Sequence, residues 1–195
     1  MGLNNKNYHE MNNKENYLEI HVGISTRARW YLDLQETMAR LYMRCRKDRF
    51  HITSLFMHDD TKKDELKDAL SRFLFHRSAP HLTFNKLDVF TNRPGTEHIV
   101  NLTSTHPEVE FQVFVESLRK EACRLGIGME PFRLHVTLAR VPVDVISLEE
   151  LKKIIGGINV REFTLPLTTL EYRYRNPNLA EGLIGKWKLK PFSKV

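Results

Sequence analysis

Residues 49–53 of the chain read Arg-Phe-His-Ile-Thr, and residues 133–137 read Arg-Leu-His-Val-Thr. Both stretches alternate Arg, His and Thr with apolar residues. This alternation predicts a strand whose polar side chains share one face while its apolar side chains pack on a core. The two histidines, His51 and His135, are 84 residues apart (135 − 51). The recurrence of one polar pattern in two buried strands points to function.

The elements around the two stretches also repeat, in the order helix, histidine strand, helix, strand, strand. Helical spacing of apolar residues predicts helices over 27–45, 62–75, 107–125 and 146–159. Period-two alternation predicts strands over 17–24, 50–57, 81–90, 97–104, 132–141, 162–174 and 182–189. The same offset carries 62–75 onto 146–159 and 81–90 onto 165–174. We expect an α+β fold of two similar αβαββ units with antiparallel sheets, forming two lobes around a central cleft.

Local signals fix several helix ends in this scheme. Thr61 with Asp64, and Ser147 with Glu150, resemble capping boxes that begin helices. Gly126 supplies the C-terminal stop of the helix that follows Pro107. The two cysteines, at positions 45 and 123, fall on the expected inner faces of helices and have no neighbours at zinc-ligand spacing.

Composition predicts a globular protein. The chain has 195 residues, 41% of them apolar and 28% charged, which is enough for a sizeable core. Residues 1–16 are rich in Asn and Lys, and we expect them to be disordered and 17–195 to form a single bilobal domain. We expect a cytoplasmic monomer without a membrane segment, because no secretory or membrane-length apolar run is present. The net charge of +6 favours polyanionic partners.

The paired motifs suit chemistry on a phosphate. If the polar faces of the two strands oppose each other, His51 and His135 converge with the hydroxyls of Thr53 and Thr137. One imidazole can take a proton from a nucleophile while the other gives a proton to the leaving oxygen. The hydroxyls can donate to the phosphoryl oxygens. Such a site requires neither a metal nor a cofactor, and the sequence leaves open which histidine is the acid.

Other candidates have competing explanations. Alternation places Arg49 and Arg133 beside the histidines, although a solvent-facing Arg explains them nearly as well. Tyr172 and Tyr174 alternate with Arg173 and Arg175, a pattern that suits base stacking and phosphate binding but also a charged edge strand.

A third His-x-Thr, at His81 and Thr83, lies outside the repeat. We interpret His81 as a structural residue, which is the usual role of a single histidine in a strand.

The motifs HITS at 51–54 and HVTLAR at 135–140 resemble those of the two-histidine (2H) phosphoesterase superfamily, in its RNA 2′-5′ ligase-like branch. The resemblance runs from about Tyr17 onward. It implies a bilobal fold and metal-independent action on 2′,3′-cyclic phosphates or 2′-5′ linkages, with RNA joining in some members. The implied partners are RNA ends, cyclic nucleotides or short 2′-5′ oligonucleotides. Ser54 and Leu134 depart from the family pattern, which usually has Leu and often Pro there.

Carried over by position, the resemblance makes His51 and His135 the acid/base pair. Thr53 and Thr137 become phosphate-binding residues, and Arg140 becomes the basic residue after the second motif. We therefore predict a cyclic phosphodiesterase of the 2′-5′ RNA ligase-like type. The alternative is a module of the same fold that binds a nucleotide or RNA without turnover, since the sequence retains both histidines in either case.

Overall fold

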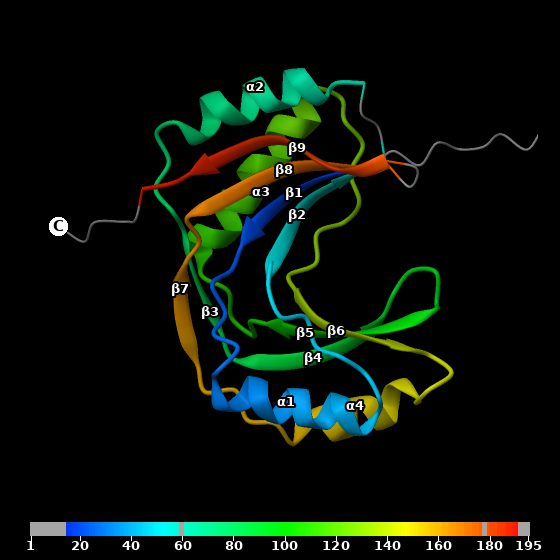
Figure 1. Cartoon of the computed structure of the whole chain (residues 1–195). Coiled ribbons are helices and arrows are strands. Elements are labelled where there is room, and N and C mark those ends of the chain that lie inside the picture. Colours follow the sequence, from blue (N-terminus) through cyan, green and yellow to red (C-terminus); the bar gives the residue numbers. More distant parts are fainter. Residues whose placement is uncertain (1–14, 59–60, 177–178, 191–195) are drawn as a thin grey trace, which may run out of the picture.

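The computed structural model describes residues 15–58, 61–176 and 179–190. Two lobes face each other, and each has an antiparallel sheet toward the middle of the molecule and two helices outside it (Figure 1). The predicted α+β fold with antiparallel sheets is confirmed. Within the described part of the chain, no helix is long and apolar enough to span a membrane.

The first lobe contains His51. Its sheet has the strand order β2-β1-β8-β9. These strands are β1 (Glu15–His21), β2 (His51–Met57), β8 (Thr169–Asn176) and β9 (Leu179–Lys188). The helices packed on this sheet are α2 (Lys63–Leu74) and α3 (Val109–Arg124). Leu18, Ile20, Ile52 and Leu55 are fully buried between β1, β2 and these helices, so the apolar half of each strand anchors the polar half.

The second lobe contains the strand that follows His135. Its sheet has the order β4-β5-β6. The strands are β4 (Lys86–Thr91), β5 (Glu97–Thr103) and β6 (Val136–Pro142), and the helices are α1 (Arg29–Arg40) and α4 (Leu148–Gly156). A further antiparallel pair, β3 (His81–Phe84) with β7 (Phe163–Pro166), runs along one side and joins the lobes (Figure 1).

The predicted internal repeat is present, and the lobes exchange strands. Moving β2 by 84 residues gives 135–141, which matches β6 to within one residue, and the same shift places β4 inside β8 and β5 inside β9. However, β2 shares its sheet with β8 and β9 of the second repeat, and β6 shares its sheet with β4 and β5 of the first. Each lobe is thus built around one histidine strand, but neither half of the chain contains a complete lobe.

Several predicted boundaries are wrong. β1 begins at Glu15, so the last two residues of the segment 1–16 are ordered in a strand, while residues 1–14 lie outside the described residues. α1 ends at Arg40, and Cys45 instead forms an isolated bridge with Ala139 of β6. Cys123 is exposed on α3 rather than facing the core.

Two of the three predicted helix ends are confirmed, and one is not. Ser147 caps α4 as predicted, since its hydroxyl accepts a hydrogen bond from the Glu150 amide at 3.2 Å. α2 begins at Lys63, and its N-cap residue is Lys62 rather than Thr61. The predicted stop at Gly126 is confirmed by a φ of 71° just after α3, in the left-handed region that glycine adopts without strain.

Candidate active site

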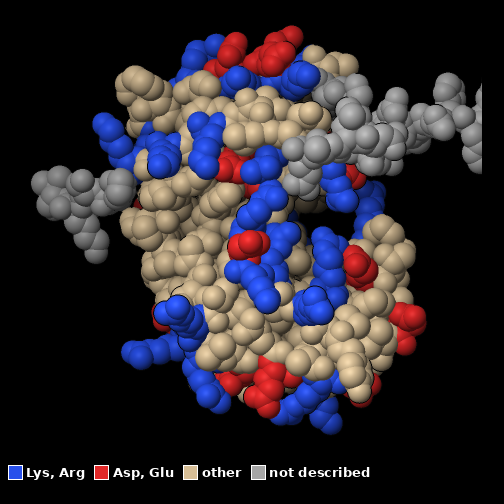
Figure 2. Space-filling view, viewed as in Figure 1, with Lys and Arg blue, Asp and Glu red and all other residues tan. Residues whose placement is uncertain are grey.

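A cleft between the lobes contains both histidines. The cavity at the His51 end is about 190 Å³ in volume, and the cavity at the His135 end is about 560 Å³. The two cavities share the lining residues Glu15, Thr53 and Phe56, so they adjoin each other. Lys and Arg side chains gather around the hollow between the lobes (Figure 2). The structure thus brings the two motifs to adjoining cavities between the lobes.

The two histidine motifs have the same local backbone geometry. In each, the histidine Nδ1 lies 2.9 Å from the carbonyl oxygen two residues earlier, which belongs to Arg49 in one motif and Arg133 in the other. This local turn explains why the strands start later than expected: Arg49 has a φ of 50°, and β6 begins only at Val136. Each ring is therefore held through Nδ1.

Each motif also carries a β-bulge three residues after its histidine. The pairing of β1 with β2 skips Ser54, and the pairing of β5 with β6 skips Leu138. A bulge bends the strand and redirects side chains, and it is common beside active sites. Ser54, a departure from the family pattern, uses its buried hydroxyl to donate to the Leu18 carbonyl at 3.1 Å. Its polar side chain is thus satisfied at the bulge.

His51 is held at three points. Besides its bond to the Arg49 carbonyl, its Nδ1 lies 3.1 Å from Nη1 of Arg46. Its Nε2 lies 3.1 Å from Oε1 of Glu19, which projects from the neighbouring strand β1. Burial lowers the pKa of His51 to about 4, helped by the nearby Arg46 charge and only partly opposed by the Arg49 carbonyl.

His135 has a more apolar environment. Its ring is perpendicular to that of Phe90 at 5.2 Å between centroids, and the Arg133 guanidinium lies over the same Phe90 ring at 3.6 Å from its centroid. Burial lowers the pKa of His135, and the Arg133 and Arg140 charges add to this effect while the Arg133 carbonyl opposes it. Both imidazoles therefore favour the neutral form at neutral pH.

The predicted phosphate-binding residues take different positions. Thr53 lines both cavities. Thr137 is half-buried on β6, where it pairs with Asn101. Arg140 also lies on β6, yet it lines the cavity of His51, so the second lobe contributes a cation to the first histidine. Glu97 holds Arg140 by an ion pair of 2.7 Å.

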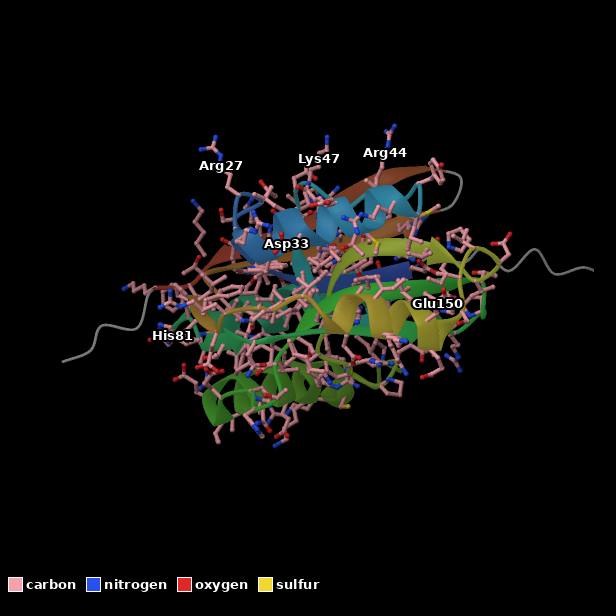
Figure 3. The ribbon with its side chains drawn as sticks, turned by 90° about the horizontal axis from the view of Figure 1, so that it is seen from below. Arg27, Asp33, Arg44, Lys47, His81 and Glu150 are labelled. Atoms are coloured by element: carbon pink, nitrogen blue, oxygen red, sulfur yellow. The ribbon has the colours of Figure 1, made fainter. Side chains whose placement is uncertain are left out.

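Both motif arginines line the cleft. Arg49 lines the His51 cavity and Arg133 lines the His135 cavity, where it is oriented by Phe90. The predicted location beside the histidines is therefore found, although both residues precede the strands. The third His-x-Thr lies elsewhere: His81 on β3 contacts Glu110 at 3.2 Å, away from Lys47 and Arg44 in Figure 3.

The tyrosines of the 172–175 run face away from the cleft. Tyr172 is only 1% exposed, and the ring of Tyr174 packs on Gly182 so closely that a Cβ there would lie 1.8 Å from it. Strand alternation puts the arginines on the other side of β8, where Arg173 reaches Glu19 and Arg175 lines the His51 cavity. Neither Tyr172 nor Tyr174 lines the two cavities, whereas Arg175 lines the one at His51.

A buried ion-pair network supports the floor of the cleft. Glu171 on β8 accepts from Arg173 at 2.6 Å and from Lys186 at 2.7 Å, and it lies 3.2 Å from Nε2 of His21. Burial alone would raise the pKa of Glu171, but the hydrogen bonds from Lys186 and Arg173 outweigh it and lower the pKa to about 2. Glu171 is therefore ionised.

The same region contains a cluster with metal-ligand chemistry. Ligand atoms of Glu19, His21 and Glu171 lie within 4.8 Å of one another. Arg173 and Lys186 already direct their charges at the two carboxylates. A divalent ion would have to displace or repel these cations, so we interpret the cluster as an ion-pair network rather than a metal centre.

Sequence reasoning missed Glu19 and Arg46 as site residues. Glu19 stood out only as a polar residue alternating with apolar ones in the opening strand, which also describes a solvent-facing position. It is in fact 2% exposed. Arg46 belongs to a segment expected to follow a helix, and its place beside His51 depends on a backbone bond from its amide to the Leu138 carbonyl across the cleft.

Comparison with known proteins places the fold. No protein-family model and no curated protein matches the sequence. Among solved structures, LigT of E. coli with bound 3′-AMP is 17% identical, with 90% of this chain and 98% of LigT aligned and a TM-score of 0.58. Usb1 of Kluyveromyces marxianus with uridine monophosphate is 8% identical, with coverages of 92% and 99% and a TM-score of 0.61.

A solved structure described as a phosphoesterase is also 17% identical, with coverages of 91% and 98% and a TM-score of 0.58. These alignments extend over both lobes and include nearly the whole of each partner. At such low identity they establish the fold and leave the reaction to be argued from the site. The chain has the fold of the two-histidine phosphoesterases, as the resemblance of its paired motifs predicted.

Proposed function

We propose that the protein is a metal-independent phosphodiesterase that acts on 2′,3′-cyclic phosphates or 2′-5′ linkages at RNA ends or in nucleotides. The observation that carries the proposal is that His51 and His135 come from separate repeats yet line adjoining cavities that share Thr53. Two histidines positioned in this way can move protons at opposite sides of one phosphorus.

The smaller cavity suits the phosphate. Four arginines line it together with His51 and Thr53, and these are Arg46, Arg49, Arg140 and Arg175. Guanidinium groups and hydroxyls bind the non-bridging oxygens of a phosphate and stabilise the negative charge that grows on them during displacement. Arg140 comes from the opposite lobe, so both lobes contribute cations to this cavity.

The larger cavity suits the nucleoside. Its volume of about 560 Å³ lies within the range of small-ligand sites, and Phe56, Pro94 and Pro131 give it apolar walls. The complexes of LigT with 3′-AMP and of Usb1 with uridine monophosphate show that this fold holds nucleotides. We infer that the nucleoside lies beside His135, with its phosphate reaching toward His51.

An RNA end is favoured over a free nucleotide by the basic surface next to the cleft. Arg49 also lines a neighbouring depression of about 570 Å³, together with His21 and Lys47. Lys47, Arg27 and Arg44 project from the same edge of the molecule (Figure 3). Side chains so placed can contact phosphates beyond the reacting one.

A nucleotide-binding module is the second candidate, and one observation favours it. Both histidines have lowered pKa values, so neither ring by itself holds the proton that an acid catalyst must give. Catalysis thus requires a further source of that proton.

Turnover separates the two functions. The purified protein is incubated with a 2′,3′-cyclic mononucleotide, a 2′-5′ dinucleotide and a cyclic dinucleotide, and the products are identified by chromatography and mass. The enzyme hypothesis predicts opening of at least one substrate. Binding of nucleotide without turnover of any of them would establish the binding module instead.

A further inference from the structure

Glu19 is a buried acid that the proposed chemistry has not used. It is 2% exposed and projects into the cleft from β1, the strand paired with the strand of His51. Among the described residues its Oε2 has no hydrogen-bond partner, although the Arg173 Nε lies 3.4 Å away. Burial of a carboxyl oxygen without a hydrogen-bond partner is unfavourable, so the position of Glu19 needs a physical explanation.

The geometry at His51 fixes one proton next to Glu19. A backbone carbonyl can only accept, so a bond between His51 Nδ1 and the Arg49 carbonyl places a hydrogen on Nδ1. A neutral ring then has a bare Nε2, which lies 3.1 Å from Oε1 of Glu19. Two lone pairs at this distance repel each other, so a proton must lie between them.

The alternative tautomer cannot supply the acid proton. If Nδ1 instead accepts from Nη1 of Arg46 at 3.1 Å, the hydrogen of the neutral ring is on Nε2 and points at Glu19. Loss of that hydrogen would leave an imidazolate anion, so only the form with one hydrogen on Nδ1 and a second proton between Oε1 and Nε2 can act as the acid. The pair keeps this proton although burial disfavours the charged form of each member alone.

The charged groups around the pair stabilise it after the proton has left. Arg173 faces Glu19 from β8, and Arg46 and Arg49 lie on the segment leading into β2. His21 on β1 lies 3.7 Å from Oε2, and Glu171 on β8 opposes the negative charge of Glu19. Three arginines against one carboxylate favour an ionised Glu19 once the proton is lost.

His135 has no such partner. Its Nδ1 contacts the Arg133 carbonyl and its ring contacts Phe90. Over the described ranges, no carboxylate lies within ion-pair distance of His135, and its charged neighbours, Arg133 and Arg140, disfavour the imidazolium. The site is therefore asymmetric, with a proton stored at His51 and a neutral ring at His135.

We propose that Glu19 is a positioning residue that holds the acid proton on His51, which makes His51 the general acid and His135 the general base. This assignment deepens the proposed function and depends on it. His135 Nε2 removes a proton from the attacking water as the new P–O bond forms. The old P–O bond breaks, and its oxygen takes the proton held by the pair, leaving an ionised Glu19 and a neutral His51. Solvent later returns the proton from His135 to the pair.

The kinetic test compares Glu19→Gln with Glu19→Asp. Gln keeps the size and hydrogen bonding of Glu but cannot ionise, so His51 must hold the proton beside a neutral amide and three arginines. We expect kcat/KM near neutral pH to fall on the order of 10- to 100-fold, within the range of acid catalysis, and the alkaline limb of the pH profile to move to lower pH. Glu19→Asp should keep the alkaline limb near its wild-type position.

Glu171→Gln is the matched control, because Glu171 is a buried glutamate directly opposite Glu19 in the β1–β8 register but does not touch His51. It should shift the alkaline limb less than Glu19→Gln does. Equal shifts in the two Gln variants, or an unmoved limb in Glu19→Gln, would overturn the proposal. So would a gain of activity in Glu19→Gln.

A second readout needs no substrate. The shared proton should give a strongly downfield proton NMR signal in the wild type that is absent from Glu19→Gln and His51→Asn. If the signal is present but no substrate is turned over, the pair stands and the proposed function fails. If turnover occurs but the signal is absent and the pH profile of Glu19→Gln is unchanged, the proposed function stands and the pair is refuted.

Discussion

Removal of the Glu171 carboxylate should destabilise the whole molecule. Glu171 lies on β8, bonds both Arg173 and Lys186, and is 3% exposed. Glu171→Ala leaves the mostly buried Arg173 without its main partner. Loss of one member of a buried ion pair costs about 3–5 kcal/mol, and the lower end applies because Lys186 is 47% exposed and can be hydrated. For a chain of this length, about 3 kcal/mol corresponds to a fall in Tm of roughly 6–12 °C.

Glu171 should also make the stability of the folded protein depend on pH in the acid range. The pKa of Glu171 in the folded protein is about 2, below its ordinary value of 4.5. A lowered folded-state pKa contributes stability that is present above pH 4.5 and is lost as the pH falls through 2. The wild type should therefore lose stability across this window, and Glu171→Ala should lose less.

Thermal unfolding followed by circular dichroism at several pH values measures both effects. Glu149→Ala is the control, because Glu149 forms an exposed 3.5 Å pair with Lys152 on α4, and such pairs contribute about 0–1 kcal/mol. A Tm change in Glu171→Ala as small as in Glu149→Ala would refute the inference that this network supports the cleft.

Two further predictions concern catalysis. Activity should survive EDTA, because Arg173 and Lys186 already pair with the carboxylates of the one cluster with metal-ligand chemistry among the described residues. Loss of activity in EDTA that a divalent ion restores would contradict this prediction. Thr53→Ala should lower kcat/KM by an amount equivalent to about 2–4 kcal/mol, because it removes one hydroxyl donor that lines both cavities. A loss of activity as complete as that of a histidine variant would contradict this prediction.

The sequence predicted the repeat and the two histidines because both depend on local patterns. The spacing of apolar residues and the Arg-x-His-x-Thr motif are visible without any tertiary contact. Their consequence, two lobes each built around one histidine strand, followed from alternation and from the equal offsets of the elements.

The exchange of strands between the lobes was not predictable in this way. The hairpin β4–β5 pairs with β6 and the hairpin β8–β9 with β1, and either hairpin would have satisfied local propensity in either sheet. Pairing over such separations depends on the whole core rather than on local propensity.

Side-chain direction was the other source of error. The predicted strand over 162–174 is divided into β7 and β8, and which face of β8 meets the cleft depends on its register with β1, where Glu19 lies opposite Glu171. That register buries Tyr172 and turns Arg173 inward. The register of β1 with β2, with its bulge at Ser54, brings Glu19 to His51. A one-residue slip would have reversed both outcomes.

The most direct test of the two-histidine site is a comparison of turnover and nucleotide affinity in His51→Ala and His135→Ala. Because the imidazoles act on protons in the transition state while ground-state binding is spread over arginines and hydroxyls, each variant should lose turnover but keep nucleotide affinity within about tenfold, or roughly 1.4 kcal/mol. Calorimetric titration with a nucleotide product and a turnover assay on the same preparations give both quantities. Full turnover in either variant, or variants that differ from the wild type only in affinity, would contradict the account.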